Sequence, residues 1–384
     1  MHHFIYATKD SWISSGSNRF TGKSFTEQNF GQDEILELKK EFYNNSFDYS
    51  TRVLVSFSGT ELTNVSHSVV SNTITNPKYY LRLYEAEGNS SLSPEYTLIA
   101  HPVSKSWVEG TGKSFDDPIT ENGVSWKNTQ NEPGGTAVTW SKHDGPSSYG
   151  GSFFTGSGYA ASQSFNNESP DVEMDVSDIV NGWFDGTVSQ SAGDNYGMIL
   201  KFSGSHEDAS NSDGSITTGK LKFFSRQTNT VYSPRLEVRW DDHAPCSGSN
   251  TGSLLPLTMS GQADNTLYMK GLRDSYKTTE KVRFRIGARK RYVQKAFSTS
   301  VQTVTGSFVP EACGSYAIKD ISTGETVIPF SGYTSMSCDP TSNYFDQWMN
   351  GFHSNRVYEI IYKLKYNDGQ EVVFDDDFRF KVKE

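Results

Sequence analysis

The sequence predicts an all-β protein, and three properties of its composition indicate this fold class. Glycine is frequent, with 33 residues in 384, and stretches rich in Ala or Leu are rare. Aromatic residues make up 13% of the chain although apolar residues make up only 34%, so the chain has the rings that disordered proteins lack. Short alternating segments separated by polar turns are typical of sheets.

The length predicts two domains, or three small ones, because a single hydrophobic core rarely extends over 384 residues. The boundary falls at residues 242–253, which are small and polar with Pro and Gly, as in linkers. Residues 254–384 carry 17 Lys and Arg against 15 Asp and Glu, so the first 253 residues carry 18 against 30. We therefore expect an acidic domain over 1–241, a linker over 242–253 and a nearly neutral domain over 254–384.

Alternation of apolar and polar residues predicts eight strands in the first domain, which suggests a sandwich or jelly roll. These strands are 4–7, 35–38, 52–57, 79–84, 96–103, 196–202, 221–224 and 236–240. Residues 175–186 break the pattern and predict a short helix, with Ser177 as the cap and Gly186 as the terminator. Residues 110–170, rich in Gly, Ser and Asn, predict long surface loops.

The second domain shows the same alternation over about 130 residues, which fits an immunoglobulin-like β-sandwich. Strands are predicted at 267–270, 282–286, 316–321, 357–364 and 371–382, the last interrupted at 375–377. Asp368 and Gly369 predict a hairpin turn, because Gly readily adopts the positive φ that tight turns need. Residues 341–352 are the helical candidate of this domain.

Four segments of the first domain resemble the DNRLRE domain, a jelly roll related to carbohydrate-binding modules. SWVEGTGKSFDDPITENGVSWKN (106–128), DVSDIVNGWFDGT (175–187), DNYGMILKF (194–202) and FFSRQTNTVYSPRLEVRW (223–240) follow the order of that family's motifs. The resemblance extends over residues 1–241 and implies an N-terminal jelly-roll sandwich. Family members in secreted polysaccharide-degrading enzymes follow a signal peptide, and MHHFIYATKD has no apolar segment of that kind.

The second domain resembles the C-terminal part of virion structural proteins of T4-like marine tailed bacteriophages. The segments that carry this likeness are GLRDSYKTTEKVRFRIGARKRY, YAIKDISTGETVIPF, DPTSNYFDQWMNGF and FDDDFRFKVKE. This resemblance implies a protein that assembles in the host cytoplasm and leaves in particles, for which no secretion signal is needed. It also implies oligomers of low symmetry.

Catalytic motifs are missing from the sequence. Glu109 with Glu121 is a conceivable acid pair for glycoside hydrolysis, but Glu109 belongs to the W-x-E motif, in which Trp107 packs and the acid orders a loop. The sequence has no HExxH, GxSxG, phosphate loop or CxxC. We therefore expect no enzymatic activity and no catalytic residue.

A structural calcium ion is considered, because Asp10, Asp33, Asp241 and Asp242 lie at predicted strand ends that could converge. The loop HEDASNSDG (206–214) is also rich in carboxylates. Acidic loops are more often simply solvated, so the expectation for cofactors is none. The three cysteines, Cys246, Cys313 and Cys338, are expected to be buried or incidental thiols that form no metal or catalytic site. A disulfide between Cys313 and Cys338 is an alternative that the sequence does not decide.

Rings in the predicted long loop are candidates for stacking on sugars or for contact with neighbouring subunits. These residues are Trp126, Trp140, Tyr149, Phe153 and Tyr159.

A basic cluster in the second domain is the candidate for subunit contacts. It comprises Arg283, Arg285, Arg289, Lys290 and Arg291. Because Arg283 and Arg285 alternate with apolar residues, they indicate the polar face of a strand. The acidity of the whole chain opposes nucleic acid as a partner, so we expect these residues to face the acidic domain of a neighbouring copy.

The sequence thus favours a non-enzymatic virion component of the capsid, neck or tail, with other virion proteins and copies of itself as partners. The alternative is a carbohydrate-binding adhesin for host surface glycans. A third class, a secreted accessory module of a polysaccharide-degrading enzyme, predicts an export signal. No run of apolar residues is long enough to span a membrane, so no membrane partner is expected.

Overall fold

The computed structural model is all-β, as the composition predicts. It describes residues 1–17, 22–43, 46–88, 95–132, 134–140, 149–156, 158–166, 171–188, 195–207, 219–260, 264–292, 296–302 and 306–384. Within these ranges no helix is long and apolar enough to cross a membrane.

The chain forms two compact units that are not contiguous in sequence. The N-terminal unit comprises Ile5–Thr73 and Lys78–Val238, and the C-terminal unit comprises Met1–Phe4, Ile74–Pro77 and Arg239–Glu384. The predicted first domain, 1–241, thus differs from the N-terminal unit at its first four residues, at 74–77 and at 239–241.

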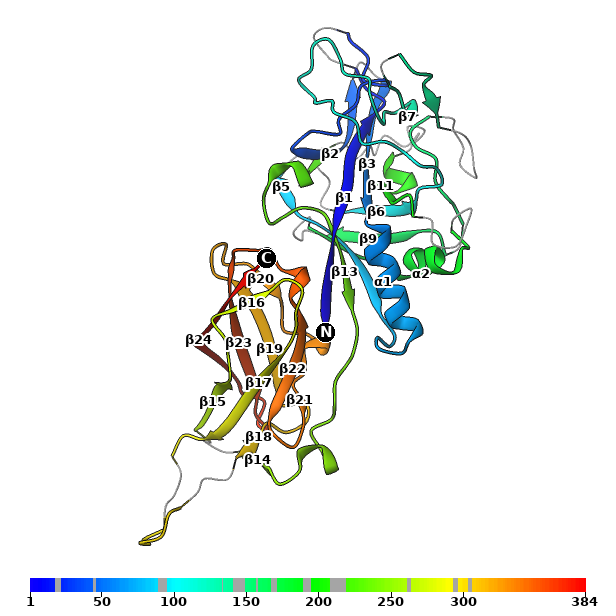
Figure 1. The fold of residues 1–384 in the computed structure, drawn as a ribbon. Coiled ribbons are helices and arrows are strands. Elements are labelled where there is room, and N and C mark those ends of the chain that lie inside the picture. Colours follow the sequence, from blue (N-terminus) through cyan, green and yellow to red (C-terminus); the bar gives the residue numbers. More distant parts are fainter. Residues whose placement is uncertain are drawn as a thin grey trace. The chain divides into compact units, whose positions relative to one another are not determined.

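An eleven-stranded sheet forms the N-terminal unit (Figure 1). Its main path runs β10-β4-β13-β1-β3-β11-β6-β9, with β2 paired to β3 and β12 paired to β2 and β5. The bounds are β1 His2–Ser14, β2 Ile35–Tyr43, β3 Ser46–Phe57, β4 Lys78–Leu83, β5 Glu85–Glu87, β6 Glu95–Pro102, β9 Ala161–Asn166, β10 Val172–Asp175, β11 Met198–Phe202, β12 Gly219–Phe224 and β13 Arg235–Arg239. A two-stranded sheet of β7 (Asn128–Gln130) and β8 (Val138–Thr139) lies in the segment predicted as loops.

The central strands β1 and β3 run antiparallel, with Asp10 opposite Val55. Successive residues 53–55 of β3 are all buried, so this strand is covered on both faces. The loops after β6 supply part of that cover, because Trp107, Trp140 and Phe153 pack against Leu54.

Three helices accompany this sheet: α1 Gly59–Val70, α2 Ser177–Asp185 and the four-residue α3 Gly204–Glu207. The prediction of a helix over 175–186 is confirmed, and Gly186 ends α2 in the left-handed conformation with φ 78°. Ser177 differs from its predicted role as the cap. It is the first residue of α2, and its hydroxyl donates a hydrogen bond to Asp175 Oδ1.

Two sheets form the C-terminal unit. One follows β14-β18-β17-β22-β21 with β15 paired to β17, and the other follows β16-β24-β23-β19-β20. Their bounds are β14 Leu255–Pro256, β15 Asn265–Lys270, β16 Ser275–Lys277, β17 Lys281–Lys290, β18 Ser307–Phe308, β19 Gly314–Asp320, β20 Thr326–Ile328, β21 Ser337–Cys338, β22 Asn343–Trp348, β23 Val357–Lys365 and β24 Glu371–Lys383. Single turns of 3-10 helix occur in both units: η1 Arg226–Thr228, η2 Gly248–Thr251, η3 Gly332–Thr334 and η4 Met349–Gly351.

Aromatic rings join the two sheets of the C-terminal unit. Phe345 of β22 stacks on Tyr316 of β19 with ring centroids 3.7 Å apart. Phe284 of β17 meets Phe380 of β24 at 5.2 Å. These four rings are buried, so they form the centre of the core between the sheets.

One local prediction for this unit is wrong, and a second holds only in part. Residues 341–352 contain strand β22 followed by the short turn η4, because Asn343, Phe345 and Gln347 alternate inward along one face. Strand β24 continues through residues 375–377. The register with β23 shifts there, and Asp377 has φ 57°, so the acidic residues form a bulge in the strand.

The segment predicted as a linker, 242–253, lies inside the C-terminal unit. Cys246 forms a disulfide with Cys338 of β21, and Cys313 is a free thiol. The expectation of three thiols and the open pairing of Cys313 with Cys338 are therefore wrong. The bridge joins residues 92 positions apart, which ties this segment to a sheet.

Candidate functional site

A cleft of about 630 Å³ lies beside Glu109 in the N-terminal unit. Its walls come from β1 and from the segments that precede and follow β7. The lining residues are Lys9, Trp107, Val108, Glu109, Gly110, Thr111, Asn122, Gly123 and Glu132. Most of them lie in residues 106–128, the segment that resembles the W-x-E motif.

Asn29 holds the loops of this cleft together. Its amide nitrogen donates to the carbonyl oxygens of Glu109 and Val124, each at 2.7 Å. Its amide oxygen accepts from the backbone nitrogens of Gly31 and Gly112. Because the side chain is fully buried, these four bonds fix the path of three chain segments without competition from water.

Two glycines allow these segments to approach each other closely. Gly110 and Gly123 have φ values of 83° and 93°, in a region that favours glycine. A Cβ on Gly123 would lie 2.5 Å from the Cα of Gly110. The cleft wall therefore requires glycine at both positions.

Glu109 is part of a hydrogen-bonded ion pair. Arg226 Nη1 donates to both carboxylate oxygens of Glu109 at 3.0 Å. The backbone nitrogen of Asp10 donates to Glu109 Oε1 at 3.0 Å. The backbone nitrogen of Arg226 in turn donates to Asp10 Oδ2 at 2.7 Å, so β1, the W-x-E segment and η1 are joined at one point.

Burial raises the pKa of Asp10 to about 7, and the neighbouring charge of Glu109 adds to the rise. Within the described part of the chain, Asp10 Oδ1 has no hydrogen-bond partner. A carboxylate that is buried with one oxygen unsatisfied favours the protonated form, which can donate. Asp10 therefore changes charge near neutral pH.

Lys9 supplies the cation of the cleft. Its Nζ donates to the carbonyl oxygen of Trp107 at 3.0 Å and lies 4.7 Å from the centre of the indole ring. Burial lowers the pKa of Lys9, and the charge of Glu109 opposes that shift. The exposed carboxylate of Glu132 also lines the cleft, so the cleft has both donors and acceptors for a polar ligand.

Asp33, one of the four aspartates predicted as metal ligands, is bonded to the protein. Trp12 Nε1 donates to Oδ2 at 2.9 Å, and the backbone nitrogen and hydroxyl of Ser114 donate to Oδ1. The carboxylate thus joins β1 to the loop after Glu109. This explains its burial without an ion.

The structure does not bring the four aspartates together. Asp10 and Asp33 belong to the N-terminal unit, whereas Asp241 and Asp242 belong to the C-terminal unit. Asp241 Oδ1 accepts from the backbone nitrogen of His243, and Asp242 Oδ1 accepts from the terminal amine of Met1 at 3.3 Å. In the described residues no group of three or more His, Cys, Asp or Glu could hold a metal ion. Most of the loop 206–214 lies outside the described residues.

The ring residues predicted for sugar or subunit contacts are mostly turned inward. Trp140 and Phe153 lie in the core, where the exposed fractions of their side chains are 2% and 7%. Trp126 is half-buried under the guanidinium of Arg52, 5.0 Å from its ring centre. Trp140 and Phe153 are therefore unavailable to stack on an external sugar.

The remaining two rings are more accessible. Tyr149 is 46% exposed. Tyr159 is half-buried and packs against Phe154 at 5.9 Å.

The first two residues of the predicted basic cluster are used within their own sheet. Arg283 forms two hydrogen bonds with Asp346 and lies 4.0 Å from the ring centre of Tyr344. Arg285 pairs with Asp339 at 2.8 Å. These contacts across β17, β21 and β22 stabilise the sheet, so the two side chains are not free for a partner.

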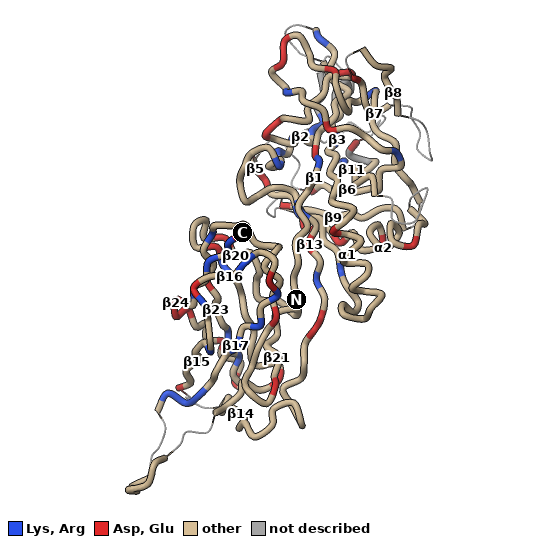
Figure 2. The backbone as a smooth tube through the Cα atoms, in the orientation of Figure 1, with Lys and Arg blue, Asp and Glu red and all other residues tan. Residues whose placement is uncertain are grey.

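The other three basic residues, Arg289, Lys290 and Arg291, are exposed at the end of β17. Figure 2 shows them as a continuous blue segment that leads towards residues 296–302. Arg291 lies 3.6 Å from Asp264, a loose and solvent-exposed pair. This strand end therefore presents net positive charge to solvent.

An exposed apolar tip follows this basic strand end. The exposed fractions are 76% for Tyr292, 114% for Phe297 and 94% for Val301. Residues 296–302 form a closed turn in which Gln302 bonds through its side chain to both backbone groups of Ala296. Sequence reasoning missed these apolar residues because they do not alternate as in a strand, and their signal was two isolated apolar residues among Ser and Thr.

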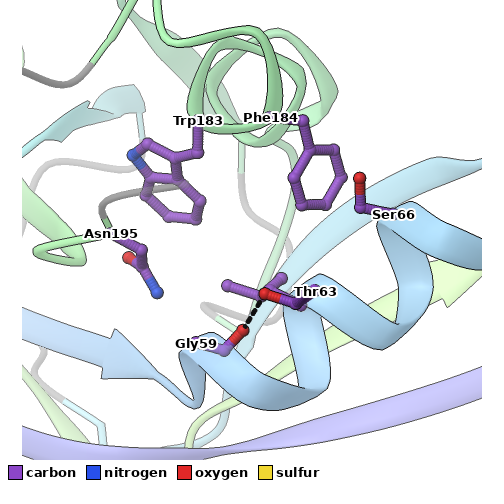
Figure 3. A pocket seen from close by; sticks show the side chains of 7 residues that line it. Gly59, Thr63, Ser66, Trp183, Phe184 and Asn195 are labelled. Atoms are coloured by element: carbon purple, nitrogen blue, oxygen red, sulfur yellow. Dashed lines mark hydrogen bonds between the residues drawn. The ribbon is translucent and has the colours of Figure 1, made fainter. Parts of the chain in front are cut away.

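A second, smaller pocket of about 160 Å³ lies between α1 and α2. Gly59, Leu62, Thr63 and Ser66 of α1 line it with Trp183 and Phe184 of α2 and with Asn195. Figure 3 shows the two rings over α1, with Asn195 on the side of the indole nitrogen. Sequence reasoning did not predict α1, so this pocket was not foreseen.

The comparisons with known proteins establish no family. No protein-family model and no curated protein matches this chain. Among solved structures, the adhesin domain of Epf from Streptococcus pyogenes aligns over 100% of this chain and 92% of that chain, with 8% identity and a TM-score of 0.16. A TM-score that low carries no argument about fold or function.

Proposed function

We propose that this chain is a non-enzymatic structural component of a tailed-phage particle, joining or decorating the capsid, neck or tail. The observation that carries the proposal is the exposed apolar tip, Phe297 and Val301, beside the basic strand end of Arg289, Lys290 and Arg291. The resemblance of the second domain to virion structural proteins supports the same role. A jelly-roll N-terminal domain and an immunoglobulin-like C-terminal domain are part of the proposal.

The exposed tip favours attachment to a neighbour on energetic grounds. Large apolar side chains that gather on a surface mark contact sites, whereas single ones are unremarkable. Burying one Phe or Val side chain contributes about 1.5–3 kcal/mol. Basic residues beside the tip would set the orientation and rate of docking more than its strength.

Rigid units suit a role in a particle because little rearrangement is needed when they dock. In the C-terminal unit the stacked rings of Tyr316 and Phe345 and the disulfide of Cys246 and Cys338 contribute this rigidity. Disulfides are rare in the reducing cytoplasm and persist outside cells. We therefore propose that the bridge closes after particles are released.

Mass spectrometry of purified virions tests the proposal directly. The chain should be present in stoichiometric amounts, and Phe297→Ser with Val301→Ser should reduce its incorporation while leaving its thermal unfolding unchanged. Val373→Ser is the matched control, because Val373 is a 55% exposed residue on β24. Absence of the chain from particles would contradict the proposal.

A carbohydrate-binding adhesin is the second candidate, and the cleft beside Glu109 favours it. The cleft has the size of small-molecule sites, and Lys9, Asn122 and Glu132 place donors and acceptors on its lining. Glycan-array binding that Asn122→Ala with Glu132→Ala abolishes, and that Trp126→Ala leaves intact, would support this function. A folded protein that binds no glycan on the array would contradict it.

A further inference from the structure

The pocket between α1 and α2 has the dimensions of one aromatic ring. Its volume is about 160 Å³, close to the roughly 150 Å³ of a cavity that holds benzene. Leu62, Trp183 and Phe184 supply apolar walls. Thr63 is exposed, and Ser66 and Phe184 are half-buried, so this part of the lining is accessible from solvent.

The tip of the C-terminal unit carries a ring of the matching size. The side chain of Phe297 is 114% exposed, and Val301 on the same turn is 94% exposed. The side chain of Gln302 bonds to both backbone groups of Ala296, which closes the turn that presents them. Transfer of a fully exposed phenyl ring from water into an apolar pocket is favourable.

The charges around the two features are opposite. Helices α1 and α2 carry Glu61, Asp178 and Asp185, all exposed, and neither helix contains Lys or Arg. The strand end before Phe297 carries three exposed basic residues, 289–291. Opposite charges on two surfaces favour the encounter of those surfaces, whereas two surfaces of the same charge repel each other.

We infer that Phe297 of one copy inserts into the pocket between α1 and α2 of a second copy, with residues 289–291 facing Glu61 and Asp185. The inference rests on the proposed structural function and names one partner for it. We call the side chain of Phe297 the knob. Because the knob and the pocket lie on different parts of the chain, the contact is head-to-tail and forms rings or open chains. A contact centred on one side chain is weak by itself and gains strength through repetition in an assembly.

Sedimentation velocity over a concentration series tests the inference with two complementary variants. Phe297→Ser removes the knob and keeps the pocket, whereas Ser66→Trp fills the pocket and keeps the knob. Wild type should self-associate. For each variant alone, the dissociation constant of self-association should rise at least about ten-fold, which corresponds to a loss of 1.4 kcal/mol. An equimolar mixture of the two variants should form heterodimers and nothing larger, because it has one intact knob and one intact pocket per pair.

Matched controls separate this contact from general damage. Asn64→Trp adds the same ring to α1 at an exposed position outside the pocket lining, and Val373→Ser removes an exposed apolar group elsewhere. Both should associate like wild type, and circular dichroism should show that every variant folds. High salt should weaken the association of wild type.

Several results would overturn the inference. They are a monomeric wild type at all concentrations, a mixture of variants that stays monomeric, or a loss with Asn64→Trp equal to that with Ser66→Trp. Binding of a monomeric wild type to phosphatidylserine-containing vesicles, lost in Phe297→Ser, would assign the tip to lipid and also overturn it. If the chain is present in virions but monomeric in this test, the proposed function stands and the inference is wrong. If the chain associates through Phe297 but is absent from virions, the inference stands and the proposed function is wrong.

Discussion

The two units of the chain achieve rigidity by different physical means. In the N-terminal unit, buried polar side chains such as Asn29 and Asp33 bind loop backbones, and Trp140 and Phe153 of those loops turn inward. In the C-terminal unit, stacked rings and a disulfide hold two sheets together, and the loop after β17 turns Phe297 outward. The contrast shows that a loop of aromatic and small polar residues can bury its rings in the core in one unit and expose a ring to solvent in the other.

The largest effect is expected from removing a ring of the C-terminal core. Phe284→Ala should lower the free energy of unfolding by about 4 kcal/mol, because it leaves a cavity between the sheets. Hydrogen exchange should accelerate in β17 and β24 and stay unchanged in β3 and β11, which lie wholly in the N-terminal unit. Equal acceleration in both units would contradict the separation of the two cores.

Loss of the disulfide should have the next largest effect. Cys246→Ser should lower the free energy of unfolding by about 3 kcal/mol, because the bridge closes a long loop and constrains the unfolded chain. Denaturant titration with and without a reductant measures this: the reductant should destabilise wild type and leave Cys246→Ser unchanged. Cys313→Ser is the control and should behave as wild type under oxidising conditions, since Cys313 is outside the bridge.

A smaller, pH-dependent effect is expected in the N-terminal unit. The folded-state pKa of Asp10 is about 7 against an ordinary value of 3.8, so its folded form binds a proton that its unfolded form releases. This carboxyl therefore costs no stability below about pH 4, and its cost grows as the pH rises from about 4 to about 7 and then levels off. Asp10→Asn should melt like wild type at pH 4 and should become increasingly more stable than wild type between pH 4 and pH 7, with no further gain at pH 8.

Differential scanning calorimetry of both proteins from pH 4 to pH 8 gives this comparison. Lower stability of Asp10→Asn at pH 8 would show that the buried carboxylate is stabilising, which would contradict the charge assignment around Glu109 and Arg226.

The smallest effect is expected at the surface of the C-terminal unit. Arg283→Ala should cost only about 0.5 kcal/mol, because its pair with Asp346 is partly exposed and screened by water. A loss above about 2 kcal/mol would show that the ladder of charged and ring side chains on β17 and β22 supports the fold as strongly as the core does. Chemical denaturation is sufficient to distinguish these outcomes.

Many of the strands could be predicted from the sequence, because a strand with one buried face has apolar residues at every second position. The segments of β17 and β23 show this alternation. The turn between β23 and β24 was predicted from Asp368 and Gly369, and Gly369 has φ 88°. Helix α1 was missed, because its Thr, Ser, Asn and Val residues are weak helix formers. It is stabilised by burial of Leu62 and Val65 and by Ser58, which accepts from the backbone nitrogen of Glu61.

The sites were less predictable than the strands, because they depend on contacts between residues distant in sequence. Glu109 was correctly placed in an ordering role for its loop, but its partners Asp10 and Arg226 lie 99 and 117 residues away. Composition favours rings in polar loops as surface contacts, whereas Trp140 donates to the carbonyl oxygen of Ser125 inside the core. The pairing of Cys246 with Cys338 likewise depends on which strands become neighbours.

The first four residues of the chain belong to the unit that is otherwise built from residues 74–77 and 239–384. Gln347 donates to the carbonyl oxygen of His2, and Phe4 is buried. During translation the ribosome must therefore complete nearly the whole polypeptide before this opening segment can dock, while the intervening residues can already fold. A protein expressed from residue 242 onward would lack these four residues, and they should be supplied either as a fused N-terminal segment or as a separate peptide.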